Sequence, residues 1–308
     1  MGNTINFENL KYFIAAAEDL NFTATAKRLY ITQQALSKQI SQLEKHYDVR
    51  LFNRTKPMTL TEAGEILYRN VRRMEHMERQ LETEMHDLKE QINGILTIGV
   101  SQNRGQVLLP PLLSAYHEKY PDVQLVIYED NLENIMKALR LGKIDLARGY
   151  DIHADISFCN VKMGSERMCA VIPENLFREH FSREDQKAIA ERGVITLKEL
   201  ECCPMIRMAP ASFLGNIIDD CCEKEQLSLK IVMISKNPVT ILRCCQTGMG
   251  AAILPEVYLN ELSVKARKEV RVFQWDYKGT NWSGGMMYLK NSYLSRAAEA
   301  FLKTCLEQ

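Results

Sequence analysis

The residues best placed to do chemistry are amides, hydroxyls and an amine that fall on one face of a predicted helix. This face consists of Gln33, Gln34, Ser37, Lys38 and Ser41. A glutamine amide can pair with two atoms of an adenine edge, and a lysine amine can reach guanine or a phosphate. Because no acid interrupts the face, it is suited to hydrogen bonding in the major groove of a nucleic-acid duplex.

An apolar pattern on the other side of the same stretch predicts the helix that carries this polar face. The apolar positions are Leu36, Ile40 and Leu43, which recur at helical spacing. Thr32 is a good N-cap because its hydroxyl can accept a hydrogen bond from a free backbone N–H. Two shorter amphipathic helices precede it, over residues 10–17 and 23–29. Short helices joined by a tight turn are typical of a helix-turn-helix.

A basic hairpin is predicted to follow these helices. Residues 49–52 form a short apolar strand, Pro57 interrupts a basic loop, and residues 59–61 can return as a second strand. Between Lys27 and Lys56 there are seven basic and two acidic residues, a local charge of +5 in a chain whose formal net charge is zero. This is the charge expected of a phosphate-contacting surface, although a solvated basic face is the alternative.

Several motifs in this region resemble the winged helix-turn-helix of LysR-type transcriptional regulators. They are residues 32–40, Leu43-Glu44, Leu51-Phe52-Asn53-Arg54 and residues 60–64. The resemblance implies binding to double-stranded DNA through Thr23, Thr32, Gln33, Gln34, Ser37, Lys38, Arg50, Arg54 and Lys56. Lys38 stands where the family usually has arginine. The wing of the family is usually about a residue longer and has a basic tip, so the resemblance implies the wing contacts less directly than the helix contacts.

A long helix is predicted after the hairpin, because no Gly or Pro follows Gly64 before Ile92. Its apolar positions are Leu67, Val71, Met74, Leu81, Met85, Leu88 and Ile92, with Glu78 as the one polar residue on the seam. A sustained seam of this spacing favours pairing with a second helix, and packing on its own domain is the alternative. The family resemblance implies the same homodimer, its assembly into a homotetramer, and a pseudo-palindromic DNA site.

The remainder of the chain alternates strands and helices, which predicts parallel sheet flanked by helices. It resembles the LysR effector domain at residues 98–101, 109–113, 120–123, 142–147 and 248–255. We therefore expect a mixed α and α/β protein whose last part is a two-lobed α/β effector domain like that of periplasmic binding proteins. The expected limits are 1–65 for the DNA-binding domain, 66–93 for the linker helix, 94–308 for the effector domain, 94–161 and 271–308 for lobe I, and 162–270 for lobe II.

Polar residues that follow predicted strands mark the expected effector site, because ligands bind at the carboxyl ends of strands in open α/β sheets. These residues are Ser101, Gln102, Arg148, Arg207, Ser212 and Asn237. Arg148 stands where the family usually has an aliphatic residue. It either binds a carboxylate or phosphate, or pairs with an acid such as Glu129 or Asp130; Arg207 has the same two interpretations. We expect a small anionic effector.

Other classes of function receive little support from the sequence. We find no catalytic triad, phosphate-binding glycine loop or metal-ligand spacing, so we expect no enzyme, cofactor or metal. No apolar run is long enough to span a membrane and no export signal is evident, so we expect a cytoplasmic protein, with RNA polymerase as a further candidate partner. Nine cysteines leave a redox trigger as an alternative to an effector, and a solute-binding module is the alternative from another class.

Overall fold

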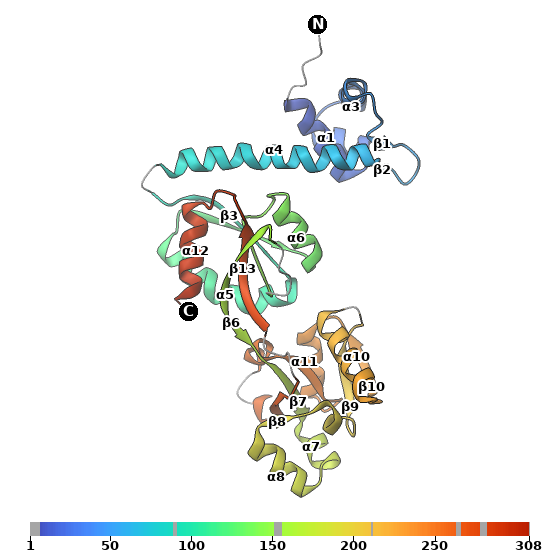
Figure 1. The fold of residues 1–308 in the computed structure, drawn as a ribbon, viewed down its shortest axis with the longest axis vertical. Coiled ribbons are helices and arrows are strands. Elements are labelled where there is room, and N and C mark those ends of the chain that lie inside the picture. The colour runs from blue at the N-terminus through green and yellow to red at the C-terminus, as the bar shows by residue number, and fades with distance from the viewer. Residues whose placement is uncertain are drawn as a thin grey trace. The chain divides into compact units, whose positions relative to one another are not determined.

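Three N-terminal helices and the start of a fourth share one apolar core in the computed structural model, which describes residues 7–88, 91–150, 156–210, 212–262, 266–277 and 282–307 (Figure 1). The three are α1 (Phe7–Asp19), α2 (Phe22–Arg28) and α3 (Gln33–Tyr47). As predicted, the Thr32 hydroxyl caps α3 by accepting from the Ala35 N–H at 3.1 Å. Phe13, Ile40 and Val71 are among the buried core residues, so α3 is held by its apolar side.

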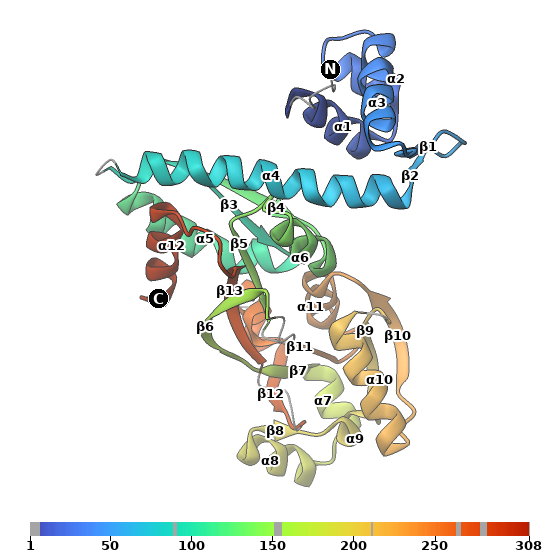
Figure 2. The same cartoon turned by 45° about the horizontal axis from the view of Figure 1, so that its top comes forward.

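A two-stranded hairpin follows α3 and confirms the predicted wing. Strands β1 (Phe52–Asn53) and β2 (Thr59–Leu60) are antiparallel. The first strand begins later than the predicted residue 49, because the Leu51 N–H donates to the Glu44 carboxylate instead of joining the ladder. Figure 2 shows the hairpin at the end of the helical cluster.

Helix α4 (Glu62–Asp87) confirms the long helix, although it ends before residue 93, the expected limit of the linker helix. The predicted apolar seam divides into two parts. Its first residues, Leu67 and Val71, pack in the core of the helix-turn-helix and cannot meet a partner helix. Its later residues Met74, Leu81, Met85 and Leu88 are exposed. Met77, which was not among the predicted seam positions, is exposed as well, and we call these five residues the apolar stripe.

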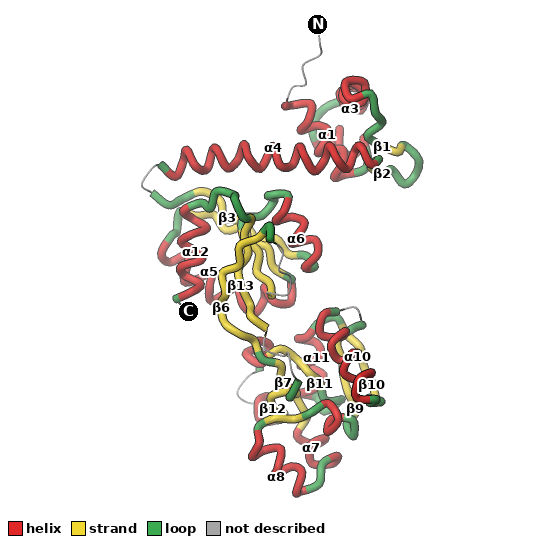
Figure 3. The backbone as a smooth tube through the Cα atoms, in the orientation of Figure 1, coloured by secondary structure: helices red, strands yellow, loops and turns green. Residues whose placement is uncertain are grey.

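Lobe I is a five-stranded sheet with the strand order β4-β3-β5-β13-β6. Its elements are β3 (Gly94–Val100), α5 (Gln102–Lys119), β4 (Val123–Glu129), α6 (Leu132–Arg140), β5 (Leu146–Tyr150), β6 (Phe158–Glu166), β13 (Trp282–Leu289) and α12 (Arg296–Leu306). Strands β4 and β5 are parallel to β3, whereas β13 is antiparallel to β5 and β6. The expectation of a parallel sheet is therefore correct for only half of the strand pairings in this lobe. Figure 3 shows the strands of the sheet in yellow and the helices beside it in red.

Lobe II contains a four-stranded sheet ordered β11-β7-β12-β8 and a parallel pair of strands, β9 and β10. Its elements are β7 (Met168–Pro173), α7 (Glu174–His180), α8 (Arg183–Arg192), β8 (Val194–Ile195), α9 (Leu197–Leu200), β9 (Pro204–Met208), α10 (Phe213–Glu225), β10 (Lys230–Ser235), α11 (Pro238–Gln246), β11 (Ala252–Pro255), the 3-10 helices η1 (Glu256–Glu261) and η2 (Ala266–Lys268), and β12 (Val270–Trp275). Strand β7 is buried along its whole length, which explains its unbroken apolar sequence. The two-lobed α/β architecture is confirmed.

The chain passes between the two sheets a few residues later than the sequence suggests. Strand β6 pairs with β13 in lobe I and β7 begins in lobe II, so the first passage is at Arg167 rather than near Asn160. Strand β12 still pairs with β7, so the second passage follows Trp275 rather than Val270. Strand β6 carries no apolar alternation because most of its residues are half-exposed, so the sequence pattern did not indicate this strand.

The contacts divide the chain into two compact units. The first contains residues 1–91 together with the short segments Lys137–Ile144 and Asn291–Ser295, and the second contains the rest. The two short segments are therefore grouped with the first unit by their contacts, although in sequence they connect elements of lobe I. No helix among the residues described is both long and apolar enough to cross a membrane.

Candidate nucleic-acid interface and effector site

The polar face of α3 is presented to solvent by a buried apolar back. Gln33, Gln34, Lys38 and Ser41 are exposed and Ser37 is half-buried. On the other side, Leu36, Ile40 and Leu43 are at most 1% exposed. Because the back is fixed in the core, the amide and amine groups project from a rigid helix, which is the arrangement that base recognition in a groove requires.

Tyr30 is a candidate contact that the sequence interpretation missed. It lies in the turn between α2 and α3, has a positive φ of 56° and is 97% exposed. Thr23, which was predicted as a contact, lies exposed in the first turn of α2, and its N–H donates to the N-cap Asn21. A solvent-exposed tyrosine beside the start of α3 can donate to a phosphate. The sequence signal for this contact was the position of Tyr30 in a two-residue turn, where no apolar core is available to bury the ring.

Glu44 organises the basic side chains of the wing. It is only 6% exposed; one carboxylate oxygen accepts from the Leu51 N–H at 2.9 Å, and the other faces Arg50 at 3.4 Å and Arg54 at 3.2 Å. The arginines themselves remain substantially exposed, and Lys56 is exposed at the tip of the wing. One buried carboxylate therefore holds two of the three predicted wing bases in place while their guanidinium groups still reach solvent.

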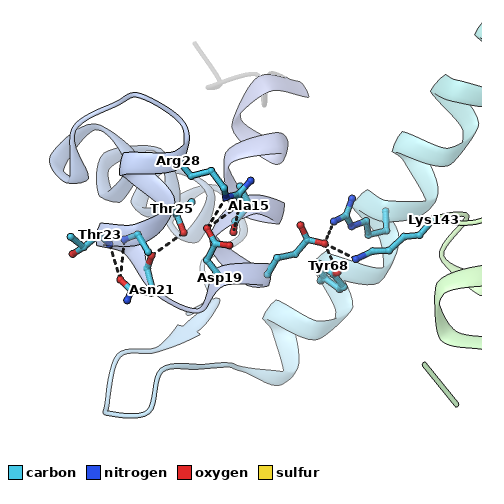
Figure 4. A network of polar contacts seen from close by, with 11 residues as sticks. Ala15, Asp19, Asn21, Thr23, Thr25, Arg28, Tyr68 and Lys143 are labelled. Carbon is cyan, nitrogen blue, oxygen red and sulfur yellow. Dashed lines mark hydrogen bonds and ion pairs between the residues drawn. The ribbon is translucent and has the colours of Figure 1, made fainter. Parts of the chain in front are cut away.

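Arg28 has a structural role instead of contributing a free positive charge. Its Nε and Nη2 donate to Asp19 at 3.0 and 2.9 Å, and Nη2 also reaches the Ala15 carbonyl at 3.3 Å (Figure 4). These bonds fix α2 to the end of α1. The predicted local charge of +5 therefore overstates the charge that is available for phosphates, since Arg28 is paired with an acid outside the stretch that was counted.

Three of the predicted effector positions lie near one contact between the lobes: Ser101, Gln102 and Asn237. Ser101 is the N-cap of α5, yet its side chain makes no capping hydrogen bond. Two residues later, the Asn103 amide donates to the Lys236 carbonyl at 3.2 Å, immediately before Asn237. The Asn237 side chain accepts from the Val239 and Thr240 N–H groups and caps α11. The N-termini of two helices therefore meet beside a serine hydroxyl that is not used for capping.

Arg148 lies on the strand next to the one that leads to Ser101. In the parallel register Ala147 is opposite Gly99, which places Arg148 level with the end of β3. Its guanidinium nitrogens would lie 2.9–3.0 Å from a Cβ atom added to Gly284, so the glycine leaves room for them. Asp130, one of the acids considered as a partner, accepts instead from the Asn131 N–H at 2.7 Å and the Asn134 amide at 2.9 Å.

The other two predicted positions, Arg207 and Ser212, serve lobe II. Arg207 pairs with Asp219 at 2.6 Å and donates to the Gly215 carbonyl at 3.1 Å. The Ser212 hydroxyl accepts from the Gly215 N–H at 3.0 Å and caps α10. The ion-pair interpretation of Arg207 is thus the one that the geometry favours.

A buried ion pair at the first passage between the lobes was not predicted. Arg104, in the first turn of α5, pairs with Glu166 at 2.9 Å, and both side chains are nearly buried. Burial also raises the pKa of the neighbouring Tyr258 to about 12, so the hydroxyl stays protonated. The two residues are far apart in sequence, and nothing in the local pattern around either one indicates the other.

The buried thiols are poorly suited to redox chemistry. Burial raises the pKa of Cys169 and Cys221 to about 11, and that of Cys245 and Cys305 to about 12. A protonated thiol is a weak nucleophile and reacts slowly with oxidants. Cys202 is exposed, but its neighbour Cys203 is buried with a raised pKa. Among the residues described, no group of His, Cys, Asp and Glu could hold a metal ion.

Models of known protein families match both the N-terminal helices and the two-lobed part of the chain. A family model described as "Bacterial regulatory helix-turn-helix protein, lysR family" matches residues 7–65, and one described as "LysR substrate binding domain" matches residues 89–308. The uncharacterized HTH-type transcriptional regulator YybE of Bacillus subtilis (strain 168) is 26% identical over 298 residues, which are 96% of this chain and 97% of that protein.

Two solved structures share the fold over nearly the whole chain. Full-length OxyR from Pseudomonas aeruginosa superposes with a TM-score of 0.73 at 18% identity and covers 98% of this chain and 95% of that one. Full-length CbnR complexed with its target DNA superposes with a TM-score of 0.65 at 18% identity and covers 98% and 99%. At these identities the likeness is one of fold.

Replacing Glu44 tests its role in the wing. Glu44→Ala leaves the buried Leu51 N–H without its acceptor, so we expect it to lower the free energy of unfolding by about 1–3 kcal/mol. Glu44→Gln keeps a carbonyl oxygen at that position and should cost less. Urea unfolding of the full chain measures both variants. Equal losses would show that the bond to Leu51 is not what the carboxylate supplies.

Proposed function

Because this chain belongs to the LysR family, it is a DNA-binding transcriptional regulator with an effector-binding domain, and we propose that it reads DNA with the exposed face of α3 and responds to a small anion. It is a regulator and not an enzyme. The observation that supports the first part is the acid-free face of Gln33, Gln34 and Lys38, held rigid by a buried back. In this proposal α3 enters the major groove, where glutamine amides read base edges.

Phosphate contacts surround the base contacts in this proposal. Arg50 and Arg54 reach the DNA backbone from the wing, Lys56 contacts it from the tip, and Thr23 and Tyr30 contact it beside the start of α3. The caps of α2 and α3 leave backbone N–H groups near the same surface. Phosphate contacts set the orientation on the duplex and provide salt-dependent affinity without carrying sequence information.

We propose that the apolar stripe of α4 pairs two copies of the chain. Met77, Leu81 and Met85 are each about 60% exposed, which is unusual for large apolar side chains that recur on one helix face. Pairing through this stripe would give a homodimer with two recognition helices and hence a pseudo-palindromic site. Assembly into a tetramer and contact with RNA polymerase are further parts of the proposal that follow from the family.

An anionic effector fits the residues around Ser101. Two helix N-termini, those of α5 and α11, meet there, and their positive ends favour a negative charge. Arg148 would provide the matching cation, with Ser101, Gln102 and Asn237 completing the site. Binding must favour one arrangement of the two lobes over another in order to change how the protein occupies DNA. The buried thiols give the redox alternative little support.

DNA recognition can be tested with a duplex that is selected from a random pool by the purified protein. Gln34→Ala should weaken binding to the selected duplex by about 1–3 kcal/mol and affect an unrelated duplex much less. Lys56→Ala is the matched control, since it should reduce the salt dependence by roughly one counterion and leave sequence preference unchanged. Fluorescence anisotropy over a range of salt concentrations measures both. An equal loss on both duplexes for Gln34→Ala would remove this residue from base recognition.

Dimerisation can be tested at the centre of the apolar stripe. Leu81→Arg places a charge where two stripes would meet, so we expect sedimentation to show a shift towards monomer at micromolar concentration. Glu82→Arg places the same side chain beside the stripe and should leave the mass of the assembly unchanged. A dimer that persists in Leu81→Arg would argue that other surfaces join the copies.

The anion site can be tested by calorimetry with a panel of mono- and dicarboxylic acids. For any acid that binds, Arg148→Ala should reduce the affinity by about 1.5–3 kcal/mol, the range for a hydrogen bond to a charged group. Arg207→Ala is the control, because Arg207 is already paired with Asp219 and its loss should affect stability more than affinity. Unchanged affinity in Arg148→Ala would exclude this arginine from the site.

A further inference from the structure

Helix α4 has a second functional face, on the side opposite the apolar stripe. Its residues recur at helical spacing and are polar or aromatic: Tyr68, Arg72, His76, Arg79, Thr83 and Asp87. At 100° per residue, Arg72 and Leu81 point in opposite directions from the helix axis. A helix that served only to pair two subunits would need no such second face.

This polar face holds the two short segments of lobe I that belong to the first unit. The Arg79 guanidinium donates to the Gly142 carbonyl, and the His76 ring shares a hydrogen bond of 2.9 Å with the Ser292 hydroxyl. The Tyr293 hydroxyl donates to Asp87 at 2.9 Å. These contacts are spread over more than two turns of α4, so the segments lie along the helix rather than touching it at one point.

Gly142 makes this close approach possible. It has a positive φ of 63°, and a Cβ atom there would lie 2.1 Å from the His76 ring. The turn therefore needs glycine both for its backbone conformation and for the lack of a side chain. Its tight fit against His76 fixes where the next residue, Lys143, emerges.

Lys143 meets a carboxylate of the DNA-binding domain at this point. Its Nζ lies 2.5 Å from Glu18 at the end of α1, and the same carboxylate oxygen accepts from Arg72 of α4. Both cations also lie over the Tyr68 ring, Lys143 at 5.8 Å and Arg72 at 5.5 Å from its centroid (Figure 4). We call Glu18, Tyr68, Arg72 and Lys143 the Glu18 cluster.

The cluster is too enclosed to be an ordinary surface ion pair. The Arg72 side chain is 14% exposed, and those of Lys143 and Glu18 are about a third exposed. Burial alone would raise the pKa of Glu18, but the hydrogen bonds and charges of Lys143 and Arg72 outweigh it and lower that pKa. The carboxylate is thus ionised and depends on both cations.

We propose that the Glu18 cluster transmits movement of the segment Lys137–Ile144 to the DNA-binding domain. The segment leads into β5, which carries Arg148 five residues after Lys143. On the other side, Glu18 precedes Asp19, which holds Arg28 and thereby α2. A movement of β5 therefore reaches the helix-turn-helix through the Glu18 carboxylate. When Lys143 withdraws, Arg72 still holds Glu18, so α1 stays attached to α4 while the link to lobe I is lost.

Carbodiimide coupling of the full-length protein tests the contact directly, because this reagent joins only a carboxylate and an amine that touch. We expect an amide between Glu18 and Lys143 in the peptide mass spectrum, formed within one chain when labelled and unlabelled protein are mixed. Lys143→Arg keeps the charge and removes the coupling. Lys119 and Glu307, 2.5 Å apart and exposed, are the positive control. Coupling of that control pair alone, or coupling of Glu18 to Lys143 only between chains, would overturn the proposal.

Hydrogen exchange tests the transmission. In Lys143→Gln we expect the amides of residues 15–20 to exchange about fivefold faster than in the unmodified protein, the effect of losing roughly one such ion pair. Lys137→Gln removes an exposed charge from the same segment and should leave them unchanged, and Lys143→Arg should restore slow exchange. Unchanged exchange at residues 15–20 in Lys143→Gln would refute transmission through Glu18. Neither experiment uses DNA or effector, so failure here leaves the proposed function standing.

Discussion

The apolar contact between the back of α3 and the core of the DNA-binding domain is the interaction on which the rest depends. Leu36, Ile40 and Leu43 are almost fully buried, and they fix the direction in which the amides on the opposite side project. A core of this density tolerates little change of volume or shape. Because Val71 of α4 lies in the same core, α3 and the start of α4 pack together, and whatever orients that part of α4 also orients the polar face of α3.

Local sequence patterns predicted the elements whose two sides differ in polarity. The spacing of Leu36, Ile40 and Leu43 and the cap at Thr32 determine α3 without reference to the rest of the chain. The same reasoning gave no indication of β6, where most residues are half-exposed. Periodicity reveals burial on one side only, so an element whose two sides are alike leaves no signal of that kind.

The candidate sites were predicted unevenly for a related reason. Residues on one helix face, such as Gln34 and Lys38, can be grouped by counting along the chain. Ion pairs that join distant segments cannot, because neither residue contains information about the other; Arg104 with Glu166 and Lys143 with Glu18 are both of this kind. Arg148 and Arg207 looked equivalent in sequence, because nothing in the local pattern indicates that Arg207 pairs with Asp219.

The two opposite faces of α4 separate the proposed subunit pairing from contacts that each chain makes with itself. Arg79 and His76 bind Gly142 and Ser292 of their own chain on one side, while the apolar stripe lies on the other side. A substitution confined to the stripe therefore alters the surface proposed for pairing and leaves these intrachain bonds in place.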